Sequence, residues 1–238
     1  MKSNNVFVLD VGNTAVKVAH FSNGELTKIN RMSREECESF DWQNNVLAIA
    51  NVSNPEFNER LNIKRNQIID INTSLKCGFK SAYHSMHTLG IDRFCNVEAM
   101  AMSEKKGNVL CIDIGTCLKF DFLDKSKIYL GGSISPGIDM RFNSLHNYTA
   151  RLPLIEKKQF NRLSGKSTEE SILSGVMLGI QGEILHRIAM YEDQYQDLIV
   201  FITGGDACYF DFHQKSNIFA DENLTVKGIY SIYSRYAD

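Results

Sequence analysis

Residues 6–17 read VFVLDVGNTAVK, and residues 109–119 read VLCIDIGTCLK. Each stretch is an apolar run that ends in an aspartate, followed by a glycine turn, a threonine and a second apolar run that carries a lysine. Short runs rich in valine and isoleucine, bounded by glycine, are typical of β-strands. The sequence therefore predicts two similar strand–turn–strand elements, Asp10–Lys17 and Asp113–Lys119, one in each half of the chain.

A third strand is expected in each copy, because turn-forming residues follow each second run at 22–24 (SNG) and 124–126 (DKS). These third strands are Glu25–Asn30 and Ile128–Ser133. Two three-stranded units so far apart indicate two related subdomains, whereas an array of small repeats has a period of ~20–50 residues.

The break before the second copy is the polar, glycine-containing stretch 105–108 (KKGN). We therefore expect two subdomains, residues 1–106 and residues 107–238, each of a usual domain size. Helix and strand patterns alternate along the chain, which indicates the α/β class.

Helix starts are marked by capping residues and prolines. Capping boxes at 33–36 (SREE) and 167–170 (STEE) predict a short helix and a long one. Three glycines roughly one turn apart in the long helix, Gly175, Gly179 and Gly182, indicate close packing against another backbone. Further helices are expected from Pro55, from Asp92 to Ser103, after Gly137 and after the Gly204-Gly205 turn, and further strands are expected at Val46–Ala50, Gln67–Ile71 and Leu198–Thr203.

Composition is that of an ordinary globular protein, with 43% hydrophobic and 23% charged residues among 238. The net charge of −2 and the absence of a long basic run argue against a nucleic-acid partner. No stretch approaches the ~18 apolar residues of a membrane helix, and the first apolar run is too short for a signal peptide. Six cysteines without a Cys-x-x-Cys pair indicate reduced thiols, so we expect a cytoplasmic protein without membrane contact.

The paired turns offer a site for phosphate. A glycine turn presents backbone N–H groups and a threonine hydroxyl to anionic oxygens, and the strand-end aspartate can hold the Mg²⁺ that accompanies ATP. Phosphoryl transfer depends mainly on such positioning and charge neutralisation. One copy alone is a weak signal, since many hairpins turn this way. Two copies, together with the Gly204-Gly205 turn that could admit adenosine, favour an ATP-dependent kinase.

Further motifs lie in order along nearly the whole chain. DVGNT occupies 10–14 with Lys17, GIDR occupies 90–93 with Asn96, and DIGT occupies 113–116. GGSISPG follows at 131–137, TARLP at 149–153, GKST at 165–168 and GGD at 204–206. In these motifs the chain resembles the type III pantothenate kinases of the actin-like and hexokinase-like ATPase superfamily. The resemblance implies an α/β fold of two ribonuclease H-like subdomains, each a mixed sheet with helices.

The resemblance also implies a reaction, in which ATP phosphorylates pantothenate to 4′-phosphopantothenate, the first step of coenzyme A biosynthesis. The residues implied to surround the ATP phosphates are Asp10, Val11, Gly12, Asn13, Thr14, Ala15, Val16, Lys17 and Thr116. Asp10 would lie near Mg²⁺, and Asp113 would help to bind a monovalent cation, K⁺ or NH₄⁺. A homodimer with the substrate pocket near the subunit interface is implied as well.

The resemblance places the pantothenate site at Tyr83, Gly90, Ile91, Asp92, Arg93 and Thr168, with Asp92 as the general base. A base must accept the proton of the attacking hydroxyl, and an arginine fork suits the carboxylate of pantothenate. Each assignment has a simpler alternative. Asp92 and Thr168 could cap their helices, and Arg93 could pair with a local carboxylate.

Lys119 departs from the family pattern, which usually has a threonine at this position. Our hypothesis is that its ammonium group, beside Asp113 and Asp121, partly or wholly replaces the monovalent cation. The alternative is an exposed lysine on a strand.

Two other functions compete with pantothenate phosphorylation. One is a different small-molecule kinase of the same superfamily, acting on a sugar, an acetyl group or polyphosphate. The other is a non-catalytic accessory factor for transcription, against which the intact Asp10, Asp92 and Asp113 argue.

Overall fold

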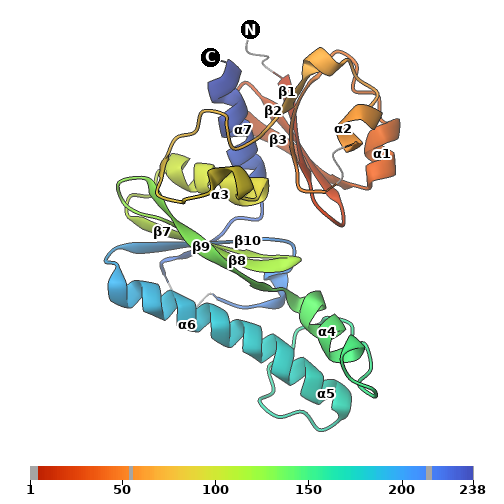
Figure 1. The fold of residues 1–238 in the computed structure, drawn as a ribbon, viewed down its shortest axis with the longest axis vertical. Coiled ribbons are helices and arrows are strands. Elements are labelled where there is room, and N and C mark those ends of the chain that lie inside the picture. Colours follow the sequence, from red (N-terminus) through yellow and green to blue (C-terminus); the bar gives the residue numbers. More distant parts are fainter. Residues whose placement is uncertain (1–4, 54–55, 213–215, 238) are drawn as a thin grey trace. The chain divides into compact units, whose positions relative to one another are not determined.

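Two mixed β-sheets form the framework of the computed structural model, which describes residues 5–53, 56–212 and 216–237 (Figure 1). The first of its two compact units combines Met1–Glu104, Lys127–Tyr129 and Asn223–Asp238. The second combines Lys105–Ser126 and Leu130–Glu222. The first break thus lies two residues before the boundary expected from the sequence, and that boundary stays a prediction. The C-terminal segment returns to the first unit.

The first unit contains a five-stranded sheet built around the first copy of the repeated element. Its strands are β1 (Asn5–Val11), β2 (Val16–Ser22), β3 (Glu25–Met32), β4 (Val46–Asn51) and β5 (Ile68–Asp70), in the order β3-β2-β1-β4-β5. β1, β2 and β3 form an antiparallel meander, whereas β4 and β5 run parallel to β1. The sheet is therefore mixed, as expected.

The second unit repeats this arrangement. Its strands are β7 (Asn108–Ile114), β8 (Cys117–Leu123), β9 (Ile128–Pro136), β10 (Leu198–Thr203) and β11 (Ile218–Ala220), in the order β9-β8-β7-β10-β11. β7 pairs antiparallel with β8 and parallel with β10. The likeness between the two turns thus extends to the strand order of both sheets. A short strand, β6 (Lys80–Ser81), pairs with the first two residues of β9, and these belong to the first unit.

The helices of the first unit are α1 (Arg34–Ser39), α2 (Phe57–Arg60), α3 (Ile91–Met102) and α7 (Leu224–Ala237), with 3-10 turns at Arg65–Gln67 and Met86–Thr88. α3 and α7 pack against each other, and a buried polar cluster joins them. Glu98 on α3 is fully buried and accepts from Gly78 N at 2.5 Å, Ser231 Oγ at 2.7 Å and Arg235 Nε at 2.9 Å. Because a buried carboxylate needs such partners, this cluster holds α7 in the first unit.

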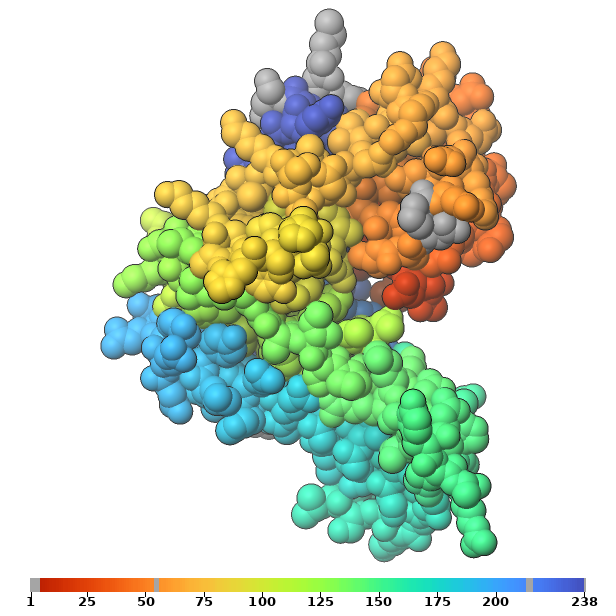
Figure 2. Space-filling model, viewed as in Figure 1, coloured from red at the N-terminus to blue at the C-terminus, as the bar shows by residue number. Residues whose placement is uncertain are grey.

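The helices of the second unit are α4 (Ile138–Asn147), α5 (Thr168–Leu173) and α6 (Gly179–Gln194), with a π-helical turn at Ser174–Leu178 between α5 and α6 and a 3-10 turn at Ala207–Tyr209. α6 runs along one face of the sheet (Figure 1). Its apolar side, with Ile180, Ile184 and Ile188, joins Phe120 and Phe122 of β8 in the core. The segment after α4 forms part of the surface (Figure 2, green).

Several local predictions are confirmed. Ser33 caps α1 with both bonds of a capping box. Glu36 N donates to Ser33 Oγ at 3.1 Å, and Ser33 N donates to Glu36 Oε2 at 2.7 Å. The strands at 46–51 and 198–203 lie where they were expected. Pro55 lies outside the described residues. Among the described residues, no helix is long and apolar enough to cross a bilayer.

Two predictions are wrong. The Gly204-Gly205 turn opens only a short 3-10 turn rather than a helix, because Asp206 N bonds back to Ile114 O at 2.9 Å and holds the chain against β7. The expected close packing at the glycines of the long helix is also absent. Within the described residues, a Cβ atom added at Gly175 or Gly182 would meet no atom within 4 Å.

Candidate active site

The first turn lies between β1 and β2. Asp10 is opposite Lys17 in the antiparallel register, and Gly12 N donates to Ala15 O at 3.1 Å to close the turn. Asn13 and Thr14 are exposed at its tip. The predicted phosphate-binding residues of the first motif thus form one continuous turn that is exposed at its tip, whereas Val11 and Val16 are buried.

Arg34 contacts this turn, and the sequence analysis missed it. Its Nη2 donates to Gly12 O at 2.9 Å and to Asn13 O at 3.0 Å. Arg34 is the first residue of α1, immediately after the N-cap Ser33. The capping box marked the helix start in the sequence, but only the tertiary structure brings that start to the turn.

Asp92 lies in the first turn of α3, where the N-cap is Gly90. The alternative that Asp92 only caps the helix is therefore wrong. Asp92 Oδ1 accepts from Arg93 N at 2.8 Å, and a Cβ atom at Gly90 would lie 2.7 Å from the same oxygen. Because glycine leaves this space open, the carboxylate can occupy the helix start.

Asp10 and Asp92 come from different motifs, but the charges of both affect the pKa of one side chain, Cys95. Burial raises the pKa of the Cys95 thiol well above its usual range, and the charges of Asp10, Asp92 and Glu98 raise it further. Both predicted carboxylates thus lie within electrostatic range of the same buried atom on α3. The fold of the first unit brings the first turn and the GIDR motif into one region.

Tyr83 and Arg93 are linked through Tyr129, which the sequence analysis also missed. Arg93 is 5% exposed, and its Nη2 donates to the Tyr129 hydroxyl at 3.0 Å. The ring of Tyr83 lies 5.7 Å from that of Tyr129. Asn96, one turn after Asp92, is fully buried and accepts from Thr225 Oγ1 at 2.9 Å, which ties α3 to α7.

The second turn is one residue shorter than the first. Gly115 N donates to Cys117 O at 3.1 Å, and Asp113 is opposite Lys119 in the register. Lys119 Nζ lies 2.7 Å from Asp113 Oδ2, with the two side chains 14% and 13% exposed. The alternative of an exposed strand lysine is therefore wrong. Asp121, two residues further along β8, is 1% exposed.

Gly204 brings the late glycine turn against the second turn. Its φ of +98° is one that side chains rarely adopt, and a Cβ atom would lie 2.2 Å from Ile114 O and 2.6 Å from Asp113 Oδ1. In the first unit, Val52 N bonds to Val11 O at 3.2 Å in the equivalent place. In each unit, the carbonyl of the residue after the strand-end aspartate thus accepts a backbone bond from the segment that follows the neighbouring parallel strand.

Lys157 joins the same region of the second unit. Its Nζ lies 2.7 Å from Asp139 Oδ2 and 2.9 Å from Asp206 Oδ1. Burial works to lower the pKa of Lys157, but the hydrogen bonds and charges of the two carboxylates outweigh it and raise the pKa. Thr116 also contacts α4, since its carbonyl accepts from Gly137 N at 3.2 Å.

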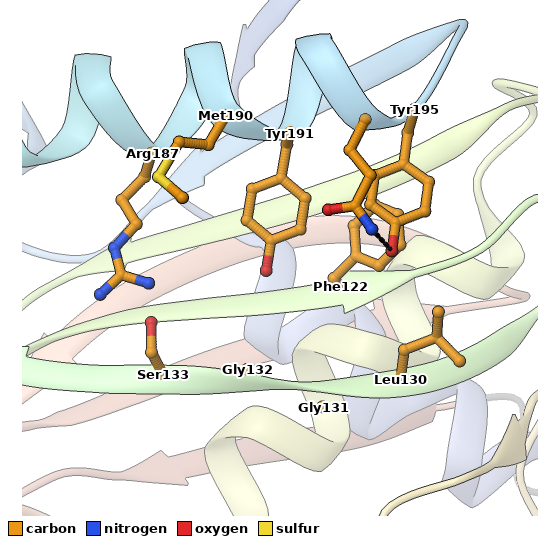
Figure 3. A pocket seen from close by; sticks show the side chains of 10 residues that line it. Phe122, Leu130, Gly131, Gly132, Ser133, Arg187, Met190, Tyr191 and Tyr195 are labelled. Atoms are coloured by element: carbon orange, nitrogen blue, oxygen red, sulfur yellow. Dashed lines mark hydrogen bonds between the residues drawn. The ribbon is translucent and has the colours of Figure 1, made fainter.

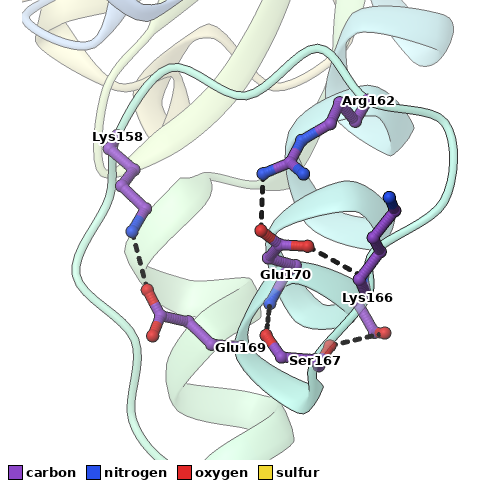
Figure 4. A network of polar contacts seen from close by, with 7 residues as sticks. Lys158, Arg162, Lys166, Ser167, Glu169 and Glu170 are labelled. Atoms are coloured by element: carbon purple, nitrogen blue, oxygen red, sulfur yellow. Dashed lines mark hydrogen bonds and ion pairs between the residues drawn. The ribbon is translucent and has the colours of Figure 1, made fainter.

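Thr168 is the first residue of α5, and its cap is Ser167, whose side chain lies beside Glu170 (Figure 4). Ser167 Oγ accepts from Glu170 N at 3.2 Å, so the alternative that Thr168 caps the helix is wrong. The capping box is also incomplete, because Glu170 Oε2 accepts from Lys166 N at 2.8 Å instead of from the N-cap. An ion pair between Lys158 and Glu169, at 2.6 Å, fixes the preceding loop to α5.

A cavity of about 370 Å³ lies between α6 and the strands β8 and β9 of the second unit (Figure 3). One wall is aromatic and consists of Tyr191, Tyr195 and Phe122. The rings of Phe122 and Tyr191 are stacked, with their centroids 4.9 Å apart. Leu130 and Met190 line it and are about half exposed, at 45% and 55%. The sequence analysis assigned no role to this face.

The comparisons with known proteins agree with the motifs. The family model described as type III pantothenate kinase matches residues 6–190. The chain belongs to the type III pantothenate kinase family. A type III pantothenate kinase of Christiangramia forsetii is 36% identical over 231 residues, which covers 93% of this chain and 95% of that protein. A type III pantothenate kinase of Phocaeicola vulgatus is 34% identical, over 95% of this chain and 97% of that protein.

Solved structures support the fold expected of a type III pantothenate kinase. A structure titled "conserved putative Baf family transcriptional activator from Campylobacter jejuni" has a TM-score of 0.64 at 21% identity and covers 97% of this chain and 98% of that one. The Alp12 filament structure has a TM-score of 0.52 at 10% identity, over 98% of this chain and 100% of that one. At such identities these likenesses show the fold alone.

Proposed function

We propose that this protein catalyses the ATP-dependent phosphorylation of pantothenate to 4′-phosphopantothenate, the first step of coenzyme A biosynthesis. Membership of the type III pantothenate kinase family, over most of the chain, carries this proposal. The geometry of the two units supplies groups suited to each part of the reaction.

The first turn is suited to the ATP phosphates. The segment Asp10–Lys17 would surround them, joined by Thr116 of the second turn. Backbone N–H groups of a turn bind phosphate oxygens, and Asp10 would hold Mg²⁺ together with those oxygens. Among the described residues, no group of three His, Cys, Asp or Glu side chains could hold a metal. Phosphate oxygens of the nucleotide would supply further ligands of the Mg²⁺.

Asp92 is suited to be the general base. The charges of Asp92 and Asp10 both help to raise the pKa of the buried Cys95 thiol, which supports a shared site. In the reaction the pantothenate hydroxyl oxygen attacks the γ-phosphorus, its proton passes to Asp92, and the bond to the β-phosphate oxygen breaks to release ADP. A base with a modest proton affinity suffices, since it accepts the proton as the new bond forms.

The other proposed pantothenate residues are Tyr83, Gly90, Ile91, Arg93 and Thr168. Arg93 is buried and already donates one hydrogen bond to Tyr129, so its guanidinium is fixed in orientation. A guanidinium fixed in orientation suits the recognition of a carboxylate such as that of pantothenate.

Asp113 is the proposed partner of a monovalent cation, and Lys119 is proposed to replace that cation partly or wholly. The 2.7 Å ion pair between them supports this replacement, because the ammonium already neutralises the Asp113 carboxylate. An ammonium group and a K⁺ ion each carry one positive charge beside such a carboxylate.

We also propose that the enzyme is a cytoplasmic homodimer. The second unit presents exposed apolar side chains that a partner subunit would cover. They are Leu130 and Ile134 on β9 and Leu185 and Met190 on α6, with exposures of 45%, 60%, 41% and 55%. Light scattering of the purified protein tests this part of the proposal.

A coupled assay of ADP release tests the function itself. The purified protein with ATP and Mg²⁺ should release ADP only when pantothenate is present. Glucose, acetate and polyphosphate serve as competing acceptors, because the main rival is another kinase of the same superfamily. Turnover with one of these, and none with pantothenate, would replace the proposal. No turnover with any acceptor would favour the transcription accessory factor.

A further inference from the structure

The first turn is held in shape by a side chain from another element. Arg34 Nη2 donates to two successive backbone carbonyls, those of Gly12 and Asn13, at 2.9 and 3.0 Å. These carbonyls lie more than twenty residues before Arg34 in the chain. A backbone bond from Gly12 N to Ala15 O also closes the turn.

The direction of these two carbonyls determines the direction of the N–H groups that follow them. In a trans peptide, the C=O of one residue and the N–H of the next point to opposite sides. Because Gly12 O and Asn13 O both point toward Arg34, the N–H groups of Asn13 and Thr14 point away from it together. Two successive N–H groups aimed to one side form a concavity that binds anions.

The capping box at the start of α1 keeps Arg34 in place. Ser33 and Glu36 exchange both bonds of the box, and Arg34 is the residue immediately after Ser33. A backbone ordered at a helix start carries less entropy cost when its side chain bonds to the turn than a mobile loop does. The guanidinium also keeps its positive charge on the side of the turn opposite the anion.

We infer that Arg34 is a positioning residue that shapes the first turn for binding nucleotide phosphates. This inference rests on the proposed function of the turn. Arg34 itself would contact the turn and not the phosphates. It holds two peptide planes so that the Asn13 and Thr14 N–H groups meet the phosphate oxygens without reorganisation.

Calorimetry with Mg·ADP and with adenosine on the full-length protein tests this role. In Arg34→Ala we expect Mg·ADP to bind about tenfold more weakly, which corresponds to one charge-assisted contact. The affinity for adenosine, which lacks phosphates, should be unchanged. KM for ATP should rise about tenfold, while kcat and KM for pantothenate change little. Arg60→Ala is the matched control, because Arg60 pairs with Glu56 on the exposed surface of the same unit.

Two outcomes would overturn the inference. One is an Arg34→Ala protein that is folded and binds Mg·ADP within twofold of the wild type. The other is an equal loss of adenosine and Mg·ADP affinity, which would indicate a general structural defect. Arg34→Met, which keeps the length of the side chain but has no donor, decides the same questions if the alanine variant unfolds. Failure of the wild type itself to bind Mg·ADP would instead contradict the proposed function.

Discussion

Lys119 Nζ lies 2.7 Å from Asp113 Oδ2 across the β7–β8 pair, with both side chains largely buried. In the register of the first unit, Lys17 occupies the same place opposite Asp10. The two turns thus share a cross-strand aspartate–lysine pair. In the second turn that pair is a close ion pair at the position proposed for a monovalent cation.

Wild-type activity is therefore expected to persist in Tris buffer free of K⁺ and NH₄⁺. Lys119→Thr should lose at least about tenfold in kcat/KM in that buffer, because Asp113 is left without its cation, and should recover when K⁺ is added. Lys125→Thr, in an exposed turn of the same unit, is the control. Negligible wild-type activity that rises many-fold with added K⁺ would show that Lys119 does not replace the cation.

Asp92→Asn should lower kcat at least about 100-fold, because general-base catalysis contributes about 10²–10⁴ in rate. The amide oxygen can still accept the bond from Arg93 N, so the melting temperature should be nearly unchanged. Steady-state kinetics and thermal unfolding measure the two effects. Glu104→Gln, an exposed residue beyond the end of α3, is the control. Full activity in Asp92→Asn would remove Asp92 as the base while leaving the kinase assignment intact.

Gly204→Ala should destabilise the protein by about 3 kcal/mol, since a side chain is strained at a φ of +98° and would meet Ile114 O at 2.2 Å. Gly205→Ala is a matched control one residue away, because a Cβ atom there has no neighbour within 4 Å. We expect its unfolding free energy to change by less than about 1 kcal/mol. Urea unfolding of both variants measures the difference, and equal effects would contradict the close approach of Gly204 to β7.

Stability should fall as the pH rises above about 9, because buried thiols, among them those of Cys95 and Cys111, ionise only in the unfolded chain. Burial raises the pKa of Cys95 and of Cys111 well above 9.0 in the folded protein. A group with a raised folded pKa contributes stability fully below its unfolded pKa and loses it as the pH rises toward the folded value. For each thiol, the free energy of unfolding should thus fall by up to about 1.4 kcal/mol per pH unit above 9.

Urea unfolding between pH 7.5 and 10 measures this slope. Cys111→Ala should show a shallower decline than the wild type, whatever its stability at pH 7.5. Cys208→Ala is the control, because Cys208 is exposed. Identical slopes in wild type and Cys111→Ala would contradict the expected role of the buried thiol.

Local patterns predicted the elements of the fold well. The apolar runs around Asp10 and Asp113 form strands as expected, because alternation and turn chemistry act between neighbouring residues. The capping box at Ser33 formed for the same reason. The motif order also identified the family, which the comparisons confirm. Predictions weakened where a residue had two local options, as with Gly90 and Asp92 at the start of α3.

Contacts between distant segments could not be predicted from the sequence. Arg34 reaches a turn more than twenty residues earlier, and Tyr129 of β9 reaches Arg93 of α3. No local pattern encodes either contact, since each depends on where packing places the elements. The same holds for the return of α7 to the first unit through Glu98.

The sequence by itself determined the two repeated strand–turn–strand elements, because their apolar periodicity and glycine turns act over a few residues. It also determined the family, through the order of the motifs. Only the tertiary structure decided that Lys119 is buried against Asp113 and that Arg34 orients the first turn. The physical reason is that burial and long-range hydrogen bonds depend on packing, and packing joins residues that the chain keeps far apart.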